Sequence, residues 1–325
     1  MPQPSIAYAV GRVRAPVNRP LSGEQLERLL AAQDYKEARQ MLSEMGWPDA
    51  PNMDIQQISV SRLEKTCKLI RDLSSDPQLT NCFLLRHDAQ NLKTLLKARI
   101  LKETPDALSA CGTIPIPVLE HAVNEHVYSK LPPPLREAMD DLEKSTALQA
   151  DPMKIDVRID QALYLMISER VKEINSPAIR EYFTAKADLQ NALAFLRVRG
   201  ASLPGLTFLQ MMLPGGRIDA AAWASLQKDP EGLAQKLIPY GKKVRAAADL
   251  ALHDKNALPA LEKAADDFLM TMFRPSRFEP FAIEVLAGYL LALERETAAV
   301  RLILSGKLNG FSMDMIRERL REAYA

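Results

Sequence analysis

The stretch that decides the fold is PQLTNCFLLRHDAQNLKTLLKAR, residues 77–99, because the chain carries a second version of it, PAIREYFTAKADLQNALAFLRVR, at residues 177–199. Residue identities recur between the two stretches at one unbroken offset of 100 positions, and five of them are taken as the signature of the repeat. They are Pro77, Phe83, Asp88, Asn91 and Arg99 in the first copy and Pro177, Phe183, Asp188, Asn191 and Arg199 in the second. Self-similarity at a fixed long period indicates an architecture built from repeated units.

The similarity continues outside this stretch. Gly112-Thr-Ile114, downstream of the first copy, is echoed by Gly216-Arg-Ile218 after a small insertion. A third, more diverged copy has Tyr289, Glu294 and Thr297 at the spacing of the phenylalanine, aspartate and asparagine, with a serine in place of the arginine and no matching upstream proline. The sequence therefore predicts three units of about 100 residues each, which we place at 1–104, 105–206 and 207–325.

Local patterns predict that these units are helical. Glycine is scarce, at 13 of 325 residues, and the intervals between prolines carry apolar residues at helical spacing. Ser22 and Gln25 fit a capping box, and Asp34 is placed to cap a helix that ends near Gly46. Residues 231–253 are expected to form one helix, and no segment shows the period of a strand. The fold class is therefore predicted to be all-α.

The repeated polar residues are expected to fix helix packing. Asp88 and Arg99 are eleven positions apart, so on one helix they project in nearly the same direction but roughly 16 Å apart along the axis. They cannot pair with each other, and each needs a partner on a neighbouring element. We interpret the repeat signature as polar cross-links within each unit; direct contact with a binding partner is the alternative.

Composition excludes several classes of function. The chain has 42 Lys and Arg against 41 Asp and Glu, a net charge of +1, which argues against nucleic acid as a partner. No phosphate-binding loop, GxGxxG fingerprint or GxSxG elbow is present. The pair His121 and His126 has the wrong spacing for a metal-binding helix, and Cys67, Cys82 and Cys111 form no CxxC motif. We therefore predict no catalytic, cofactor-binding or metal-binding residues and no small-molecule substrate.

One uncharged segment is suited to contact with another molecule. Residues 201–216 read ASLPGLTFLQMMLPGG, and their large apolar side chains either meet a partner or fill the protein's own core. Those side chains are Leu206, Phe208, Met211 and Met212. No segment reaches the roughly 20 apolar residues that a membrane span requires, and no secretory signal is visible. A cytosolic protein that does not span the bilayer is expected.

Three segments together carry a family resemblance. They are YAVGRVRA at residues 8–15, DAQNLKTLLKAR at residues 88–99, and YLLALERETAAVRLILSGK at residues 289–307. In order, spacing and total length they resemble the C subunit of the V-type ATPase, also called V/A-type, whose eukaryotic counterpart is the d subunit. The threefold internal repeat is itself a property of that family.

The resemblance implies a fold and a role. It implies an all-helical funnel of three similar domains around a pseudo-threefold axis, peripheral to the membrane on its cytoplasmic side. The funnel would sit on the proteolipid ring, accept the D and F subunits of the central shaft, and act as a rotor part without a catalytic site. The ion, proton or sodium, and the direction, pump or synthase, stay open. A helical-repeat scaffold for another cytosolic protein is the alternative, and an unrecognised all-helical enzyme is the remainder.

Overall fold

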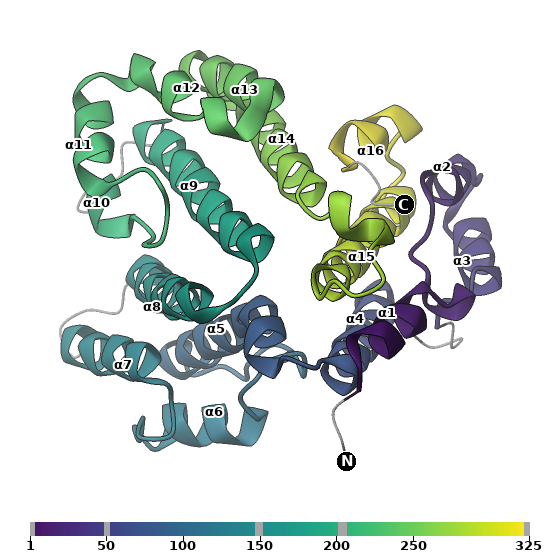
Figure 1. Cartoon of the computed structure of the whole chain (residues 1–325), viewed down its shortest axis with the longest axis horizontal. Coiled ribbons are helices and arrows are strands. Elements are labelled where there is room, and N and C mark those ends of the chain that lie inside the picture. The colour runs from purple at the N-terminus through teal and green to yellow at the C-terminus, as the bar shows by residue number, and fades with distance from the viewer. Residues whose placement is uncertain (1–3, 49–52, 147–151, 201–206, 322–325) are drawn as a thin grey trace. The chain divides into compact units, whose positions relative to one another are not determined.

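The structure is a computed structural model, and it describes residues 4–48, 53–146, 152–200 and 207–321. Within these ranges every regular element is a helix and none is a strand, which confirms the predicted all-α class (Figure 1). None of the described helices combines the length and apolar character that crossing a bilayer requires. The chain divides into two compact units, Met1–Thr80 with Asp266–Ala325 (unit 1) and Asn81–Ala265 (unit 2).

Unit 1 joins the two ends of the chain around one long helix, α15 (Glu284–Leu308), which packs against α1, α2, α3 and α4 (Figure 1). Its apolar core includes Leu29, Ile58, Val300 and Ile303, all at most 1% exposed. The other elements are α1 (Ile6–Arg14), η1 (Pro16–Asn18), α2 (Gly23–Ala31), α3 (Tyr35–Glu44), α4 (Ile55–Leu73), η5 (Pro275–Phe278) and α16 (Met313–Arg319).

The helix starts predicted near the N-terminus are confirmed. Ser22 and Gln25 form a reciprocal capping box at the start of α2, with the Ser22 hydroxyl accepting from the Gln25 N–H. Asp34 caps α3 by accepting from the Glu37 N–H at 2.8 Å. Gly46, just after that helix, has a φ of +85°, a backbone conformation that favours glycine.

The two clearest sequence repeats lie on α5 (Pro77–Leu101), which belongs to unit 2 from Asn81 onward, and on α9 (Pro177–Gly200) of unit 2. The equivalent rings of Phe83 and Phe183 lie 4.8 Å apart between centroids, so the two repeats meet at matching positions. The other elements are α6 (Ile116–Asn124), α7 (Pro133–Thr146), α8 (Pro152–Glu173), α10 (Phe208–Met211), α11 (Ala220–Lys228), η2 (Pro230–Gly232), α12 (Leu233–Lys236), η3 (Ile238–Tyr240), α13 (Gly241–His253), η4 (Lys255–Ala257) and α14 (Leu258–Thr271), whose last residues belong to unit 1.

The helix predicted at 231–253 is wrong as a single element. Pro239 removes a backbone donor, and Gly241 adopts a φ of +90°, so the chain turns between α12 and α13. The result is three short helical segments, η2, α12 and η3, followed by the regular helix α13. This turn buries the Tyr240 side chain, which is 1% exposed.

Candidate functional site

Asp88 connects α5 to the loop that leads into α6. Its carboxylate is 0% exposed. Oδ2 accepts from the Thr113 N–H at 2.9 Å and the Thr113 hydroxyl at 2.6 Å, and Oδ1 accepts from the Ile114 N–H at 2.9 Å. Three donors therefore hold the carboxylate, and the hydrogen bonds fix the loop at a set point on the helix.

Asp188 makes the equivalent connection from α9. Its Oδ2 accepts from the Arg217 N–H at 2.8 Å, and Oδ1 accepts from the Ile218 N–H at 3.2 Å. The Tyr240 hydroxyl adds a third donor at 2.5 Å. Burial raises the pKa of Asp188, and the hydrogen bond from Tyr240 opposes that shift; burial next to this carboxylate also raises the pKa of Tyr240.

The asparagines of the repeat hold the same loops one helical turn further along. The Asn91 amide donates to the Ser109 carbonyl at 2.9 Å and accepts from the Ser109 N–H at 2.8 Å. Asn191 forms the same two bonds with Leu213, at 2.9 and 2.8 Å. The partner lies 18 positions after Asn91 but 22 after Asn191, so the second loop is longer before it meets the helix in the same way.

Glycine in each loop makes the carboxylate link possible. A Cβ added to Gly112 would overlap Asp88 Oδ1, and one added to Gly216 would overlap Asp188 Oδ1, each closer than real Cβ atoms approach. Neither glycine has a positive φ, so space for the carboxylate is what the position requires. This explains why both copies of the repeat have a glycine at this loop position, Gly112 in the first and Gly216 in the second.

The repeated arginines differ between the two copies. Arg99 donates to the Glu143 carboxylate at 2.5 Å and to the Val123 carbonyl at 2.6 Å, which ties α5 to α6 and α7. The Tyr128 hydroxyl also donates to Glu143, and burial raises the pKa of Tyr128 to about 12. Arg199 is exposed at the end of α9. The carboxylate and asparagine links therefore occur in both copies, whereas the arginine link is described for the first.

The third copy lies on α15 in unit 1 and has different contacts. Tyr289 and Thr297 are buried, and the Thr297 hydroxyl donates to the Leu293 carbonyl within the helix. Glu294 is partly buried. The most buried acid of this turn is Glu296, at 3% exposed, which the sequence comparison did not single out.

Glu296 connects α15 to two earlier segments of unit 1. Its Oε1 accepts from Arg62 of α4 through Nε at 3.2 Å and Nη2 at 3.1 Å, and its Oε2 accepts from the Leu21 N–H at 2.6 Å. The Arg62 guanidinium also lies 5.4 Å from the centre of the Trp47 ring. Burial raises the pKa of Glu296, and the positive charge of Arg62 opposes that shift.

Tyr289 gives a pH-dependent prediction. Burial raises its pKa from 10.0 to about 12. The folded state keeps the phenol proton more tightly than the unfolded state, so its contribution to stability is full below about pH 10 and is lost as pH rises through the folded pKa. When the pH rises from about 9 to about 11, the free energy of unfolding should fall in both proteins. We expect the fall to be about 1 kcal/mol smaller for Tyr289→Phe than for the wild type. Urea unfolding at both pH values measures this, and equal losses would contradict it.

The uncharged segment falls partly outside the described residues, because Leu206 is not among them. Phe208 is 1% exposed and packs against the rings of Phe195 and Trp223, with centroids 5.3 and 5.0 Å away, so it belongs to the protein's own core. Met211 and Met212 are partly exposed. Contact between these methionines and a partner stays a prediction.

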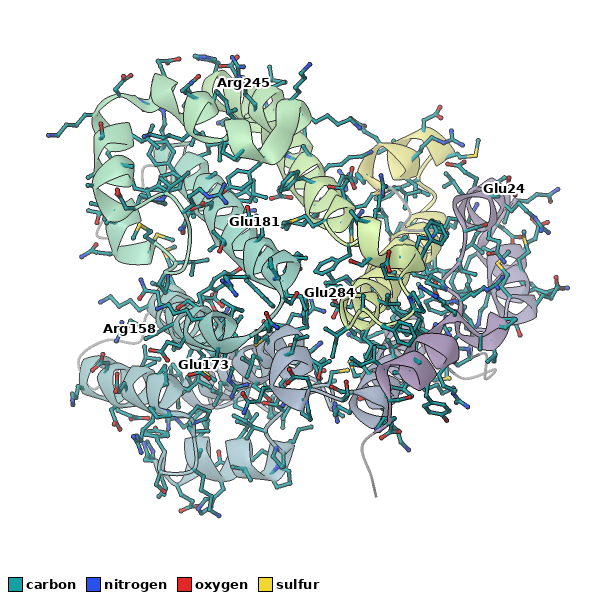
Figure 2. The ribbon with its side chains drawn as sticks, viewed as in Figure 1. Glu24, Arg158, Glu173, Glu181, Arg245 and Glu284 are labelled. Carbon is teal, nitrogen blue, oxygen red and sulfur yellow. The ribbon has the colours of Figure 1, made fainter. Side chains whose placement is uncertain are left out.

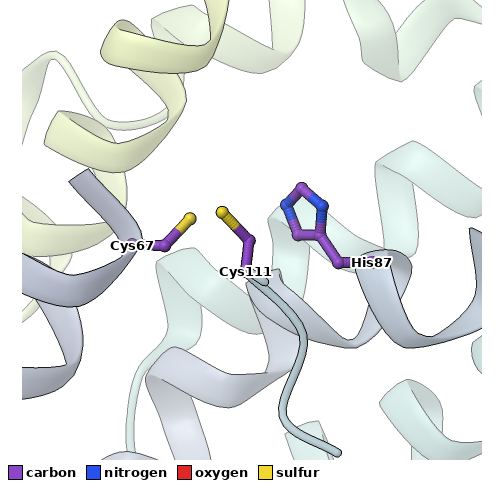
Figure 3. A group of neighbouring side chains, drawn as sticks. All are labelled: Cys67, His87 and Cys111. Atoms are coloured by element: carbon purple, nitrogen blue, oxygen red, sulfur yellow. The ribbon is translucent and has the colours of Figure 1, made fainter. Parts of the chain in front are cut away.

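Figure 3 labels three buried side chains, Cys67 of unit 1 and His87 and Cys111 of unit 2. Within unit 2, His87 Nδ1 lies 3.1 Å from the Ser109 hydroxyl oxygen, which accepts from the Cys111 N–H at 3.3 Å. These groups extend the loop network around Asn91. The absence of metal-binding residues stays a prediction from sequence.

Each of these polar groups acts by positioning. Asp88, Asp188 and Glu296 are almost fully buried, and protein donors hold their oxygens. A carboxylate in this state has little access to a solute, whereas it strongly restrains the segments that bind it. The arrangement is suited to holding long helices and their loops in one geometry.

The family model for the ATP synthase (C/AC39) subunit matches residues 9–319. The chain belongs to this family. Among curated proteins, the C subunit of the V-type sodium ATPase of Enterococcus hirae is 26% identical, over 80% of this chain and 80% of its own length. The C subunit of the V-type ATP synthase of Deinococcus radiodurans is 24% identical, over 97% of this chain and 91% of its own. The C subunit of the A-type ATP synthase of Thermococcus gammatolerans is 28% identical over 47% of this chain and 42% of its own length.

Family membership confirms the resemblance carried by residues 8–15, 88–99 and 289–307, since the matched region includes nearly all of them. The names of the relatives indicate a subunit of a rotary, ion-transporting ATPase, and no catalytic enzyme family is indicated. Membership in the family would not by itself reveal Tyr240 or Arg62 as partners of the buried acids. They become visible only in the hydrogen bonds.

Proposed function

We propose that this chain is the non-catalytic central-stalk rotor subunit of a V/A-type ATPase. It couples the rotating shaft of the ATP-hydrolysing sector to the proteolipid ring, and so contributes to ion transport. The family match over residues 9–319 carries the proposal. A helical-repeat scaffold for an unrelated cytosolic protein would share the repeat but not this match.

The polar links support the mechanical side of the proposal. A part that transmits torque must resist deformation, and in each of two repeats a buried aspartate and an asparagine fasten a long helix to the following loop. Such bonds are strong in a buried setting because the donors and acceptors have no water to exchange with. A shaft that turns against this chain would therefore move whole helices and loops together.

The proposed arrangement is three similar domains, 1–104, 105–206 and 207–325, around a pseudo-threefold axis in the form of a funnel. Its opening holds the D and F subunits of the shaft, and its other face lies on the proteolipid ring at the cytoplasmic side of the membrane. Contact over a broad surface of complementary shape holds the partners together. The net charge of +1 is compatible with such a contact, because complementary shape holds the partners and a strong electrostatic field is not required.

A bridging experiment tests the proposal. Purified D and F subunits are immobilised and mixed with detergent-solubilised proteolipid ring, with and without the full chain. We expect the ring to be retained on the shaft only when the chain is present. Retention without the chain, or failure of the chain to bind either partner, would overturn the proposal and leave the scaffold alternative.

A further inference from the structure

The three most exposed large apolar side chains of the described residues lie in unit 1. Val17 is 82% exposed, Phe278 is 79% exposed and Phe281 is 72% exposed. They come from η1 near the N-terminus and from the segment before α15, two regions that contribute to the lining of one cavity. Single exposed apolar residues are ordinary, but protruding phenylalanines beside a cavity indicate a binding surface.

Three arginines line the same cavity. Arg14, Arg19 and Arg277 line it together with Phe278, and no acidic residue is among its lining residues. Arg14 donates to the carbonyls of Arg277 and Glu279 at 2.7 and 2.9 Å, so it holds the phenylalanine segment against the end of α1. Within the described part of the chain, no acidic side chain pairs with Arg19 or Arg277. Their positive charge is available to a ligand.

The cavity itself has an apolar floor. Its volume is about 870 Å³, within the range of sites that hold small ligands. Val13, Leu21, Val285 and Tyr289 line its inner side and are at most 7% exposed. A cavity lined by buried apolar residues and by arginines suits an anion that also carries an apolar group, because a fully polar anion would leave the apolar lining without a partner.

We propose that this surface binds an anionic phospholipid at a membrane surface. Arg19 and Arg277 hold the phosphate, the apolar floor takes part of an acyl chain, and Phe278 and Phe281 enter the boundary between headgroups and acyl chains. Basic residues beside protruding aromatic side chains are the combination that holds peripheral proteins on anionic bilayers.

An acidic segment of a protein is the competing occupant, and the phenylalanines argue against it. An acidic segment would pair with the arginines but would give two phenylalanines no apolar environment. Phe278 and Phe281 stand out from the surface with more than two thirds of their area in solvent. Insertion into a fluid lipid layer uses this shape without a preformed complementary pocket.

Vesicle flotation of the full chain tests the proposal, which does not depend on the rotor role. Vesicles of phosphatidylcholine alone are compared with vesicles that also contain phosphatidylglycerol. We expect the wild type to prefer the anionic vesicles and Arg19→Gln/Arg277→Gln to bind them about 30-fold more weakly, since each basic residue near an anionic surface contributes about a factor of five. Phe278→Ser/Phe281→Ser is expected to lower binding at least about tenfold.

A matched control uses exposed residues of α13, where Lys242→Gln/Arg245→Gln removes the same charge and Leu250→Ser removes an exposed apolar side chain (Figure 2). These variants should bind vesicles like the wild type, and thermal melts should show that all variants fold. Equal binding of the wild type to both vesicles would overturn the proposal. So would an arginine variant that keeps its vesicle binding but loses binding to the D and F subunits, because the surface would then contact protein.

Discussion

Asp188→Ala is expected to lower the free energy of unfolding by about 3 kcal/mol. The substitution leaves the Tyr240 hydroxyl and the Arg217 and Ile218 N–H groups without the acceptor they share. Donors left unsatisfied in a buried site cost more than the bond itself contributes. Urea unfolding of the full chain at neutral pH measures the change. The control Asp249→Ala removes an exposed carboxylate of α13 and should change the free energy by less than about 0.5 kcal/mol.

The same link can be broken from the loop side. Gly216→Ala places a Cβ against Asp188 Oδ1, so it should also destabilise, by about 2–3 kcal/mol. In the double variant Asp188→Ala/Gly216→Ala the carboxylate that the new Cβ would overlap is absent. The combined loss of unfolding free energy should therefore be clearly smaller than the sum of the two single losses. Additive losses would contradict the account, because the glycine would then matter for another reason.

Arg62→Ala should have a comparable effect in unit 1. It removes the charge that faces Glu296, whose carboxylate stays buried and still accepts from the Leu21 N–H. Removing one partner of a buried ion pair typically costs about 3–5 kcal/mol. Burial already raises the pKa of Glu296, and the positive charge of Arg62 opposes that shift. The carboxylate therefore takes up a proton more readily in the variant, and the loss of stability should be smaller under acidic conditions than at neutral pH.

Arg158→Ala is the matched control for this prediction. Arg158 pairs with Asp141, but both side chains are about half exposed, and such pairs contribute at most about 1 kcal/mol (Figure 2). A change of the same size in Arg62→Ala and Arg158→Ala would show that the buried pair has no special role. Replacing both Arg62 and Glu296 with methionine should cost less than Arg62→Ala alone, because no charge is then left buried.

Much of the fold follows from local sequence signals. The capping residues Ser22 and Asp34 and the repeated helices α5 and α9 are where the sequence predicts them. Short-range spacing determines these features, because a cap and its helix are neighbours in the chain. The three-domain division stays a prediction.

The partners of the buried acids could not be predicted in the same way. Tyr240 lies 52 positions from Asp188, and it reaches the carboxylate only because Pro239 and Gly241 break what otherwise reads as one helix. On α15 the spacing predicts Glu294 as the repeated acid, but the acid that binds Arg62 and the Leu21 N–H is Glu296, since these groups pack against that side of the helix. Long-range packing of this kind leaves no periodic signal in a single sequence.

The most direct test of the rotor role measures ATP hydrolysis and ion transport together. The complete ATPase is reconstituted in vesicles with and without this chain. If the chain couples shaft to ring, its omission leaves ATP hydrolysis by the soluble sector but abolishes ATP-driven ion transport, and adding the chain back restores transport. Undiminished ion transport in its absence would contradict the central claim.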